Sequence, residues 1–425
     1  MTTSERFSQY VLGTYGRFPM VPVKAEGVWM TSEDGKRYLD FCCGIAVCSI
    51  GHSHPRLVEA IQTQASQLIH CSNLYQIPQQ AELAELIVEK CVGIPGKMFF
   101  SNSGAEANDG LIKLARRFGQ ASATATSAAR YEIISFNKSF HGRTLGTIAA
   151  TGQKKIKEGF DPLLPGFKHV PFNDSVALKE AVGEKTVAIL LEPLQGEGGI
   201  SPVTPLFLQT ISELREKHNL LVFFDEVQAG FGRLGEMMAW RKWMSELEPD
   251  GISWAKAMGG GFPIGGFWVA DRTFKKDGED VPLSSILGPG SHGSTYGGNP
   301  LACAASIAVL SEILEKDLPA NALRQEERIR AVAKTWTLPV LAELKGAGLM
   351  LGWKLNTTNF DPPEGQTHAL HICLKLMEAG LLTVPAGADV VRWLPPLNVT
   401  DGEVDQALEI LHSVLENVGF ASVGG

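Results

Sequence analysis

The sequence predicts an α/β protein with a mostly parallel sheet and helices on both of its faces. Short, continuous apolar runs at Ile133 to Phe136, Val187 to Leu191 and Leu220 to Phe224 have the length and composition of strands buried on both faces. A helix-like stretch, Leu206 to Lys217, lies between the last two runs, and this alternation is typical of parallel sheets. The run Gly266 to Ala270 adds a further strand.

Length and composition indicate a globular protein with a large core, since the chain has 425 residues, of which 44% are hydrophobic and 20% charged. A net charge of −8 argues against nucleic-acid binding. The N-terminus lacks the basic start and apolar core of a signal peptide, and no apolar run reaches the roughly 18 residues of a membrane helix. We therefore expect a soluble, cytoplasmic protein without membrane contact.

The seven cysteines show no paired spacing, which favours reduced thiols over a disulfide framework or a zinc site. His52 and His54 are one residue apart, and Pro55 follows His54, which indicates a turn more than a metal site. We predict no metal.

Two stretches carry the chemistry. Asp225 ends the run Leu220 to Phe224, and Lys256 precedes the glycines Gly259 to Gly261. Ligands of open α/β sheets bind outside the carboxyl ends of the strands. A carboxylate that keeps a pyridine nitrogen protonated and a lysine that forms a Schiff base are what a pyridoxal 5'-phosphate (PLP) enzyme requires. The pair predicts PLP as cofactor, although each residue alone is more often part of a strand-ending turn or a solvated lysine.

A small-residue loop, Asn102 to Asn108, joins an apolar run to a helix-like stretch. Its backbone N–H groups either bind a phosphate or only begin a helix. At another strand exit, Phe140 and Arg143 offer an aromatic ring and a carboxylate-binding guanidinium, or a core ring and a surface arginine. Ser294 and Thr295 lie in a glycine-rich loop, where their hydroxyls would close a phosphate site.

Over nearly its whole length, the chain resembles the class III (ornithine-type) PLP-dependent aminotransferases of fold type I, and within them the acetylornithine aminotransferases. The motifs that carry the resemblance include Thr14-Tyr15-Gly16-Arg17-Phe18-Pro19, Gly51-His52-Ser53-His54-Pro55, Glu192-Pro193-Leu194-Gln195-Gly196-Glu197 and Val391-Arg392-Trp393-Leu394-Pro395-Pro396-Leu397. Cys48, Asp109, Leu234, Lys345 and the pair Ser253-Trp254 depart from the usual pattern.

The resemblance implies how the cofactor is held. Lys256 would form the Schiff base, and Asp225 would pair with the pyridine nitrogen. Phe140 and Val227 would sandwich the ring, and Gln228 would meet its phenolic oxygen.

The resemblance also implies a homodimer with shared active sites. Gly104 and Ala105 would donate backbone N–H groups to the phosphate, and Thr295 would reach the phosphate bound by the neighbouring subunit.

For the substrates, the resemblance makes Arg143 the carboxylate clamp, with Tyr15 and Ser294 as further contacts. Glu197 would cover Arg392 while the amino donor reacts and release it when 2-oxoglutarate binds. The alternative is that Glu197 and Arg392 form only a structural ion pair.

The expected reaction moves the ω-amino group of N2-acetyl-L-ornithine to 2-oxoglutarate, giving N-acetyl-L-glutamate 5-semialdehyde and L-glutamate in arginine biosynthesis. The alternatives are a succinylornithine, ornithine or 4-aminobutyrate aminotransferase, a PLP aminomutase or racemase of the same fold, and a non-enzymatic relative kept for assembly. The intact Lys256, Asp225 and Arg143 argue against the last.

For the domains, we expect a large PLP-binding domain over 61–310 and a smaller α/β domain built from 1–60 and 311–425. Residues 121–130 should be a surface loop or a helix end, 356–366 a loop, and 422–425 a frayed end.

Overall fold

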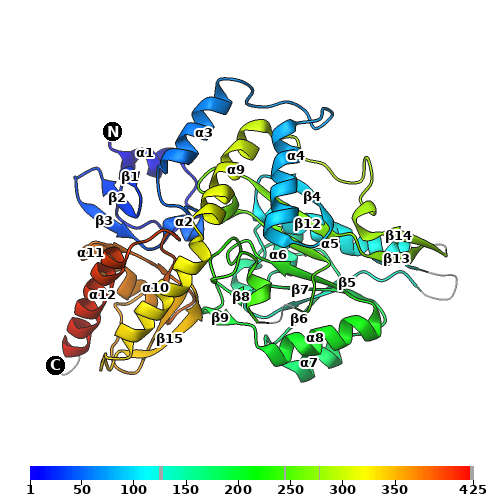
Figure 1. Cartoon of the computed structure of the whole chain (residues 1–425). Helices are drawn as coiled ribbons and strands as arrows, with labels where there is room; N and C mark the ends of the chain where they lie inside the picture. Colours follow the sequence, from blue (N-terminus) through cyan, green and yellow to red (C-terminus); the bar gives the residue numbers. More distant parts are fainter. Residues whose placement is uncertain (124–127, 244–245, 277, 422–425) are drawn as a thin grey trace.

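The computed structural model describes residues 1–123, 128–243, 246–276 and 278–421. Its centre is a seven-stranded sheet (Figure 1). In spatial order the strands are β4 (Gly96–Ser101), β12 (Gly265–Ala270), β11 (Gly251–Trp254), β10 (Leu221–Asp225), β7 (Thr186–Leu191), β5 (Glu132–Phe136) and β6 (Phe167–Val170). β12 runs antiparallel to both neighbours, and the other strands run parallel to one another. The mostly parallel sheet is confirmed.

The direction of β12 follows from the length of its connection. Only the residues 255–264 join β11 to β12, and they contain a single short 3-10 turn, η4 (Lys256–Met258). A parallel connection needs a crossover of a dozen or more residues, usually through a helix. The chain therefore turns back, and the tight return places Lys256 at the sheet edge where β10 also ends.

Helices cover both faces of the sheet, because alternate residues of β10 enter different cores. Leu221 and Phe223 pack in the core that includes residues of α5 (Gly104–Ala121), whereas Val222 and Phe224 pack in the core that includes α8 (Pro205–His218). The other helices of this part are α3 (Pro55–Ala65), α4 (Pro78–Glu85) with its π-helical end η1 (Leu86–Val92), α6 (Leu145–Ala150), α7 (Ser175–Ala181) and α9 (Pro300–Glu315). Figure 1 shows α7 and α8 side by side beneath the sheet.

The two chain ends pack together. In one four-stranded sheet, β1 (Pro22–Glu26), β2 (Trp29–Ser32) and β3 (Arg37–Asp40) are joined by β17 (Leu381–Leu382). The other contains β15 (Leu341–Ala347), β16 (Met350–Leu355), β19 (Val390–Trp393) and β18 (Val384–Pro385). They pack with α10 (Leu318–Ala333), α11 (His368–Glu378) and α12 (Asp401–Ala421). The division at 60 and 310 stays a prediction, and α9 runs through residue 310.

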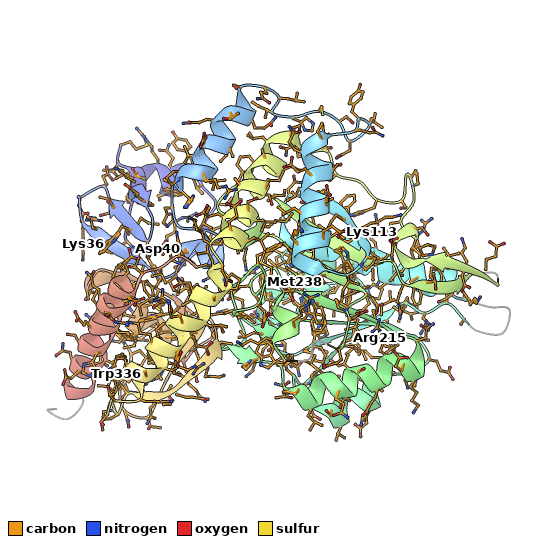
Figure 2. All side chains as sticks on the ribbon, viewed as in Figure 1. Lys36, Asp40, Lys113, Arg215, Met238 and Trp336 are labelled. Atoms are coloured by element: carbon orange, nitrogen blue, oxygen red, sulfur yellow. The ribbon has the colours of Figure 1, made fainter. Side chains whose placement is uncertain are left out.

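A chain of aromatic rings holds the ends together. Phe41 meets Trp393 edge-on, with ring centroids 4.9 Å apart, and Trp393 meets Trp353 at 5.1 Å. Trp353 stacks on Trp336 at 5.3 Å, and Figure 2 marks Trp336 among the side chains of the C-terminal part. Aromatic pairs in this distance range add to the stabilisation that burial provides.

The remaining elements are α1 (Thr3–Tyr10), α2 (Cys43–Ala46), β8 (Leu194–Gln195), β9 (Ser201–Pro202), β13 (Thr273–Lys276), β14 (Glu279–Pro282), η2 (Lys154–Ile156), η3 (Ala239–Lys242) and η5 (Leu283–Ser285). The segment 356–366 contains no helix or strand, as predicted. Of the segment 121–130, expected to be a surface loop or a helix end, residue 121 ends α5, and 124–127 lie outside the described residues, as does the expected frayed end 422–425.

Candidate active site

The strand ends bring Asp225 and Lys256 into one cavity of about 460 Å³. Asp225 is the last residue of β10 and pairs in parallel register with Ser253 of β11, three residues before Lys256. Lys256 has a φ of 42°, in the left-handed region that side chains other than glycine rarely adopt. Burial lowers the pKa of its amine, which favours the neutral form that attacks a carbonyl carbon.

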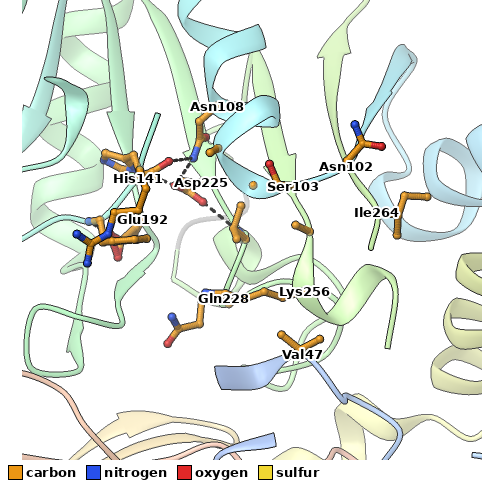
Figure 3. Close-up of a pocket in the computed structure, with 18 of the residues that line it drawn as sticks. Val47, Asn102, Ser103, Asn108, His141, Glu192, Asp225, Gln228, Lys256 and Ile264 are labelled. Carbon is orange, nitrogen blue, oxygen red and sulfur yellow. Dashed lines mark hydrogen bonds and ion pairs between the residues drawn. The ribbon is translucent and has the colours of Figure 1, made fainter. Parts of the chain in front are cut away.

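Asp225 is held on both carboxylate oxygens (Figure 3). Its Oδ2 accepts from Asn108 Nδ2 at 2.7 Å and lies 2.7 Å from His141 Nδ1, while its Oδ1 accepts the Val227 N–H at 3.0 Å. The side chain of His141 is fully buried, and its Nε2 has no hydrogen-bond partner within the described residues. The carboxylate is thus presented to the cavity in one orientation.

Most predicted site residues line the same cavity. Besides Lys256 and Asp225, its wall includes Gly104, Ala105, Phe140, Arg143, Glu197, Val227 and Gln228. Arg143 is exposed at the cavity wall, with its guanidinium 5.5 Å from the centre of the Phe140 ring. Across the described ranges, Arg143 makes no ion pair, so its charge is available to a ligand.

The loop before α5 is both a helix cap and a source of free donors. Ser103 caps the helix, since its Oγ accepts the Glu106 N–H at 3.3 Å. The first N–H groups of a helix have no intrahelical acceptor, and those of Gly104 and Ala105 find none elsewhere among the residues the structure covers. They stand at the positive end of the helix dipole, which suits a phosphate.

An arginine and a glutamate close the other side. Arg392 Nη1 lies 2.6 Å from Glu197 Oε1 and donates to Gln228 Oε1 at 2.9 Å. The Arg392 side chain is 1% exposed, whereas that of Glu197 is 30% exposed. Burial raises the pKa of Glu197, but the charge and hydrogen bond of Arg392 outweigh this and hold it below its ordinary value.

Four predicted residues lie outside the cavity lining, and one of them is Arg392, which is joined to the wall through Glu197 and Gln228. Ser294 adjoins it, because its Oγ accepts from Asn102 Nδ2 at 3.1 Å. Tyr15 is 75% exposed, and Thr295 is also exposed. The contact expected of Thr295 would form only across a dimer, and its role and that of Tyr15 stay predictions.

Sequence reasoning assigned no role to Asn108 and Glu192, which line the cavity. Glu192 accepts the backbone N–H of Phe140 at 2.7 Å and that of Gly196 at 3.2 Å. Burial, followed by the nearby charge of Asp225, raises the pKa of Glu192 well above its ordinary value. Two signals pointed to these residues, since Asn108 lies one helical turn after Gly104 and Glu192 opens the motif that ends in Glu197.

A group with metal-ligand chemistry lies elsewhere: one atom each of Asp40, Cys43 and His52 lie within 4.8 Å of one another. These groups bond within the protein, because His52 Nε2 is 2.7 Å from Asp40 Oδ2 and the Cys43 N–H donates to Asp40 Oδ1 at 2.9 Å. The expectation of no metal stays a prediction. All seven cysteines are free thiols in the described part of the chain, and Cys42, Cys48 and Cys71 among them are partly exposed.

The residues present fit PLP. The first turn of α5 offers unpaired donors for a phosphate, Asp225 offers an acceptor for a protonated ring nitrogen, and Lys256 offers the amine. A Cβ added at Gly104 would lie 2.7 Å from Val227 Cγ1, so the wall is already closely packed where the helix meets the cavity. No helix in the described ranges is long and apolar enough to cross a membrane.

Comparisons with known proteins identify the family of the chain. Residues 11–415 match the family "Aminotransferase class-III". The acetylornithine aminotransferase of Caldanaerobacter subterraneus subsp. tengcongensis is 44% identical over 422 residues, covering 99% of this chain and 100% of that protein. That of Gloeobacter violaceus is 43% identical, covering 97% and 98%.

Solved structures show the same fold. The ornithine aminotransferase of Toxoplasma gondii, solved with partial occupancy of PLP, superposes with a TM-score of 0.88 at 29% identity, covering 99% of this chain and 95% of that one. The acetylornithine aminotransferase of Elizabethkingia anophelis gives 0.80 at 29% identity, covering 97% and 98%. The chain therefore belongs to the class III aminotransferase family and is a PLP-dependent aminotransferase of fold type I.

Proposed function

We propose that this enzyme transfers the ω-amino group of N2-acetyl-L-ornithine to 2-oxoglutarate, giving N-acetyl-L-glutamate 5-semialdehyde and L-glutamate in arginine biosynthesis. Full-length relatives that carry the name acetylornithine aminotransferase support the choice of donor. The observation that carries the chemistry is a cavity whose wall contains one uncovered arginine, Arg143, and a glutamate, Glu197, that pairs with a second arginine, Arg392, outside the lining.

When bound, PLP supplies an electron sink that stabilises negative charge at the carbon bearing the amino group. Lys256, whose amine pKa is lowered by burial, would hold the cofactor covalently. Its Nζ would also take up and return the proton of the substrate carbon that bears the amino group. Asp225 would accept the hydrogen bond of a protonated ring nitrogen, and Phe140 and Val227 would hold the two faces of the ring.

Other residues position the cofactor at its edges. The N–H groups of Gly104 and Ala105 would hold the phosphate at the start of α5. Gln228 would hold the phenolic oxygen through its amide nitrogen, because its Oε1 already accepts from Arg392.

The two arginines let one cavity accept two different substrates. Arg143 binds the α-carboxylate of the donor and, in the second half-reaction, a carboxylate of 2-oxoglutarate. Glu197 neutralises Arg392 while the uncharged acyl arm of the donor is present. Its partial exposure allows it to swing away when the second carboxylate of 2-oxoglutarate arrives. Tyr15 and Ser294 complete the substrate contacts in this proposal.

A homodimer with shared sites is part of the proposal. Leu74, Tyr75 and Tyr296 expose 89%, 68% and 62% of their surfaces, which is unusual for large apolar side chains gathered in two loops. Asn73 Nδ2 donates to the carbonyls of Ser294 and Gly297, both at 3.0 Å, and so joins these loops. If a second copy of the chain covers these loops, Thr295 of the first copy would lie at the phosphate site of the second. Sedimentation should give twice the chain mass of 45.9 kDa.

We also propose a large PLP-binding domain over 61–310 with a smaller domain from 1–60 and 311–425, and a cytoplasmic location. The free thiols support the location, because such cysteines persist in reducing compartments.

The first test is an absorbance scan of the purified holoenzyme. N-acetylornithine should abolish the long-wavelength band of the lysine-bound cofactor, and 2-oxoglutarate should restore it. Lys256→Ala should lack this band. A band that responds to ornithine, succinylornithine or 4-aminobutyrate but not to N-acetylornithine would replace the donor. A donor that bleaches the band without needing 2-oxoglutarate for turnover would indicate an aminomutase.

The proposed movement of Glu197 away from Arg392 has its own test in Glu197→Gln, which keeps the shape of the side chain and removes its charge. The uncovered Arg392 should then bind carboxylates in both half-reactions, and the preference for N-acetylornithine over glutamate as donor should fall about tenfold. Glu378→Gln is the matched control, because Glu378 pairs with Lys375 at the surface. An unchanged preference in Glu197→Gln would leave the pair a purely structural one.

A further inference from the structure

We propose that Asn108 and Ser253 are positioning residues that orient the Asp225 carboxylate toward the ring nitrogen of the cofactor. The inference rests on the proposed role of Asp225. It adds one residue from helix α5, Asn108, which lines the cavity, and one from strand β11, Ser253, which does not line it.

The three side chains form one buried line of hydrogen bonds. Ser253 Oγ donates to Asn108 Oδ1 at 2.6 Å, and Asn108 Nδ2 donates to Asp225 Oδ2 at 2.7 Å. The second hydrogen of the same amide is used by the carbonyl of His141 at 2.9 Å. Figure 3 shows Asn108 reaching from its helix toward both Asp225 and His141.

The surroundings allow the Asn108 amide only one orientation. A carboxylate and a backbone carbonyl can only accept hydrogen bonds, so the amide nitrogen must face Asp225 and His141. The amide oxygen must then face Ser253, whose hydroxyl is free to donate. Ser253, Asn108 and Asp225 are 0%, 1% and 4% exposed, so bulk water cannot replace any member.

The line fixes a carboxylate that would otherwise rotate. Asp225 ends its strand, and the Val227 N–H holds only its Oδ1. Asn108 and His141 hold Oδ2 from the helix side and the loop side. Since hydrogen bonds to a charged group are about twice as strong as neutral ones, the amide of Asn108 contributes directly to the geometry of the ion pair with the ring nitrogen.

The decisive variant is Asn108→Asp, which keeps the size of the side chain and puts a carboxyl oxygen where the amide donates. Two carboxyl groups in contact must share a proton or separate, and either outcome weakens the pairing of Asp225 with the ring nitrogen. We expect the Kd of the apoenzyme for PLP to rise at least about tenfold. The pH at which the long-wavelength band changes should shift as well, a change that a merely structural role would not produce.

Ser253 provides a graded series. Ser253→Ala removes the donor that faces the amide oxygen and should raise the Kd for PLP about fivefold. Ser253→Thr keeps the hydroxyl and should bind PLP within about twofold of the wild type. Asn173→Asp is the matched control for Asn108→Asp, since Asn173 bonds to Pro202 outside the cavity. Melting of each apo variant reports on folding.

Unchanged PLP affinity and band in Asn108→Asp would overturn the inference. If that variant does not fold, unchanged values in Ser253→Ala would overturn it equally. Asp225→Asn, measured in parallel, distinguishes failure of the positioning role from failure of the proposed function. If Asp225→Asn also binds PLP normally, the role of Asp225 itself is wrong. If Asp225→Asn alone weakens binding, only the positioning role is wrong.

Discussion

Replacing Gly104 with alanine is expected to weaken cofactor binding while leaving helix α5 folded. Gly104 is the first residue of α5, and its φ lies outside the left-handed region, so the backbone accepts a side chain. The added Cβ, however, would lie 2.7 Å from Val227 Cγ1 and 2.8 Å from Val227 Cγ2. Val227 must therefore move until these contacts lengthen to about 3.4 Å, and it lines the cavity where the ring is proposed to bind.

The two effects on stability oppose each other. Alanine in place of glycine favours a helix by up to about 1 kcal/mol, and less in the first turn. Overpacking of a closely packed contact costs about 1–3 kcal/mol. We expect the apoenzyme to lose no more than about 2 kcal/mol, whereas the displaced Val227 should raise the Kd for PLP about tenfold.

A double-mutant cycle with Val227→Ala isolates the contact. Val227→Ala removes both methyl groups, so Gly104→Ala should cost less in that background than alone, in stability and in PLP affinity. Gly402→Ala is the control, because Gly402 lies in the first turn of α12 with nothing within 4 Å of its added Cβ. Wild-type PLP affinity in Gly104→Ala, together with additive effects in the cycle, would refute the reasoning.

Two substitutions and one pH profile test single groups. Arg143→Lys should raise the KM of both substrates about tenfold or more without changing the melting temperature, because a bidentate contact is lost at an exposed site; equal KM values would remove Arg143 from the substrate site. Burial raises the pKa of Glu226 from 4.5 to about 7. The stability that its protonation contributes is therefore complete below pH 4.5 and is lost as the pH rises through about 7. Glu226→Gln does not titrate, so its free energy of unfolding relative to wild type should rise by about 3 kcal/mol between these two pH values in denaturant titrations, and a pH-independent difference would contradict the assignment. Burial lowers the pKa of Lys256 below 10.5. The rate at which the apoenzyme forms its covalent link with PLP, followed by stopped-flow absorbance, should therefore reach half its maximum below pH 10.5. A midpoint at or above that pH would contradict the lowered pKa.

Local sequence patterns were sufficient for much of the fold and of the cofactor site. A strand buried on both faces must be a continuous apolar run, so β7 and β10 were visible directly, and the polar residue that ends such a run must lie at the sheet edge. Asp225 and the start of α5 could be placed by this rule, whereas Lys256 was singled out by the glycines that follow it and not by a strand before it. The tight return into β12 was harder to read, because a run of apolar residues has no direction.

The contacts that hold Asp225 came only from the tertiary structure, whereas the family resemblance already implied the pairing of Glu197 with Arg392. Asn108 lies 117 residues before Asp225 and 145 before Ser253. Their hydrogen bonds form because helix α5 and the parallel strands converge at one edge. The sequence by itself determined which chemical groups stand at the strand ends, since apolar periodicity is local. The tertiary structure alone decided which buried polar groups face one another, since desolvation requires a partner but not one that is near in the chain.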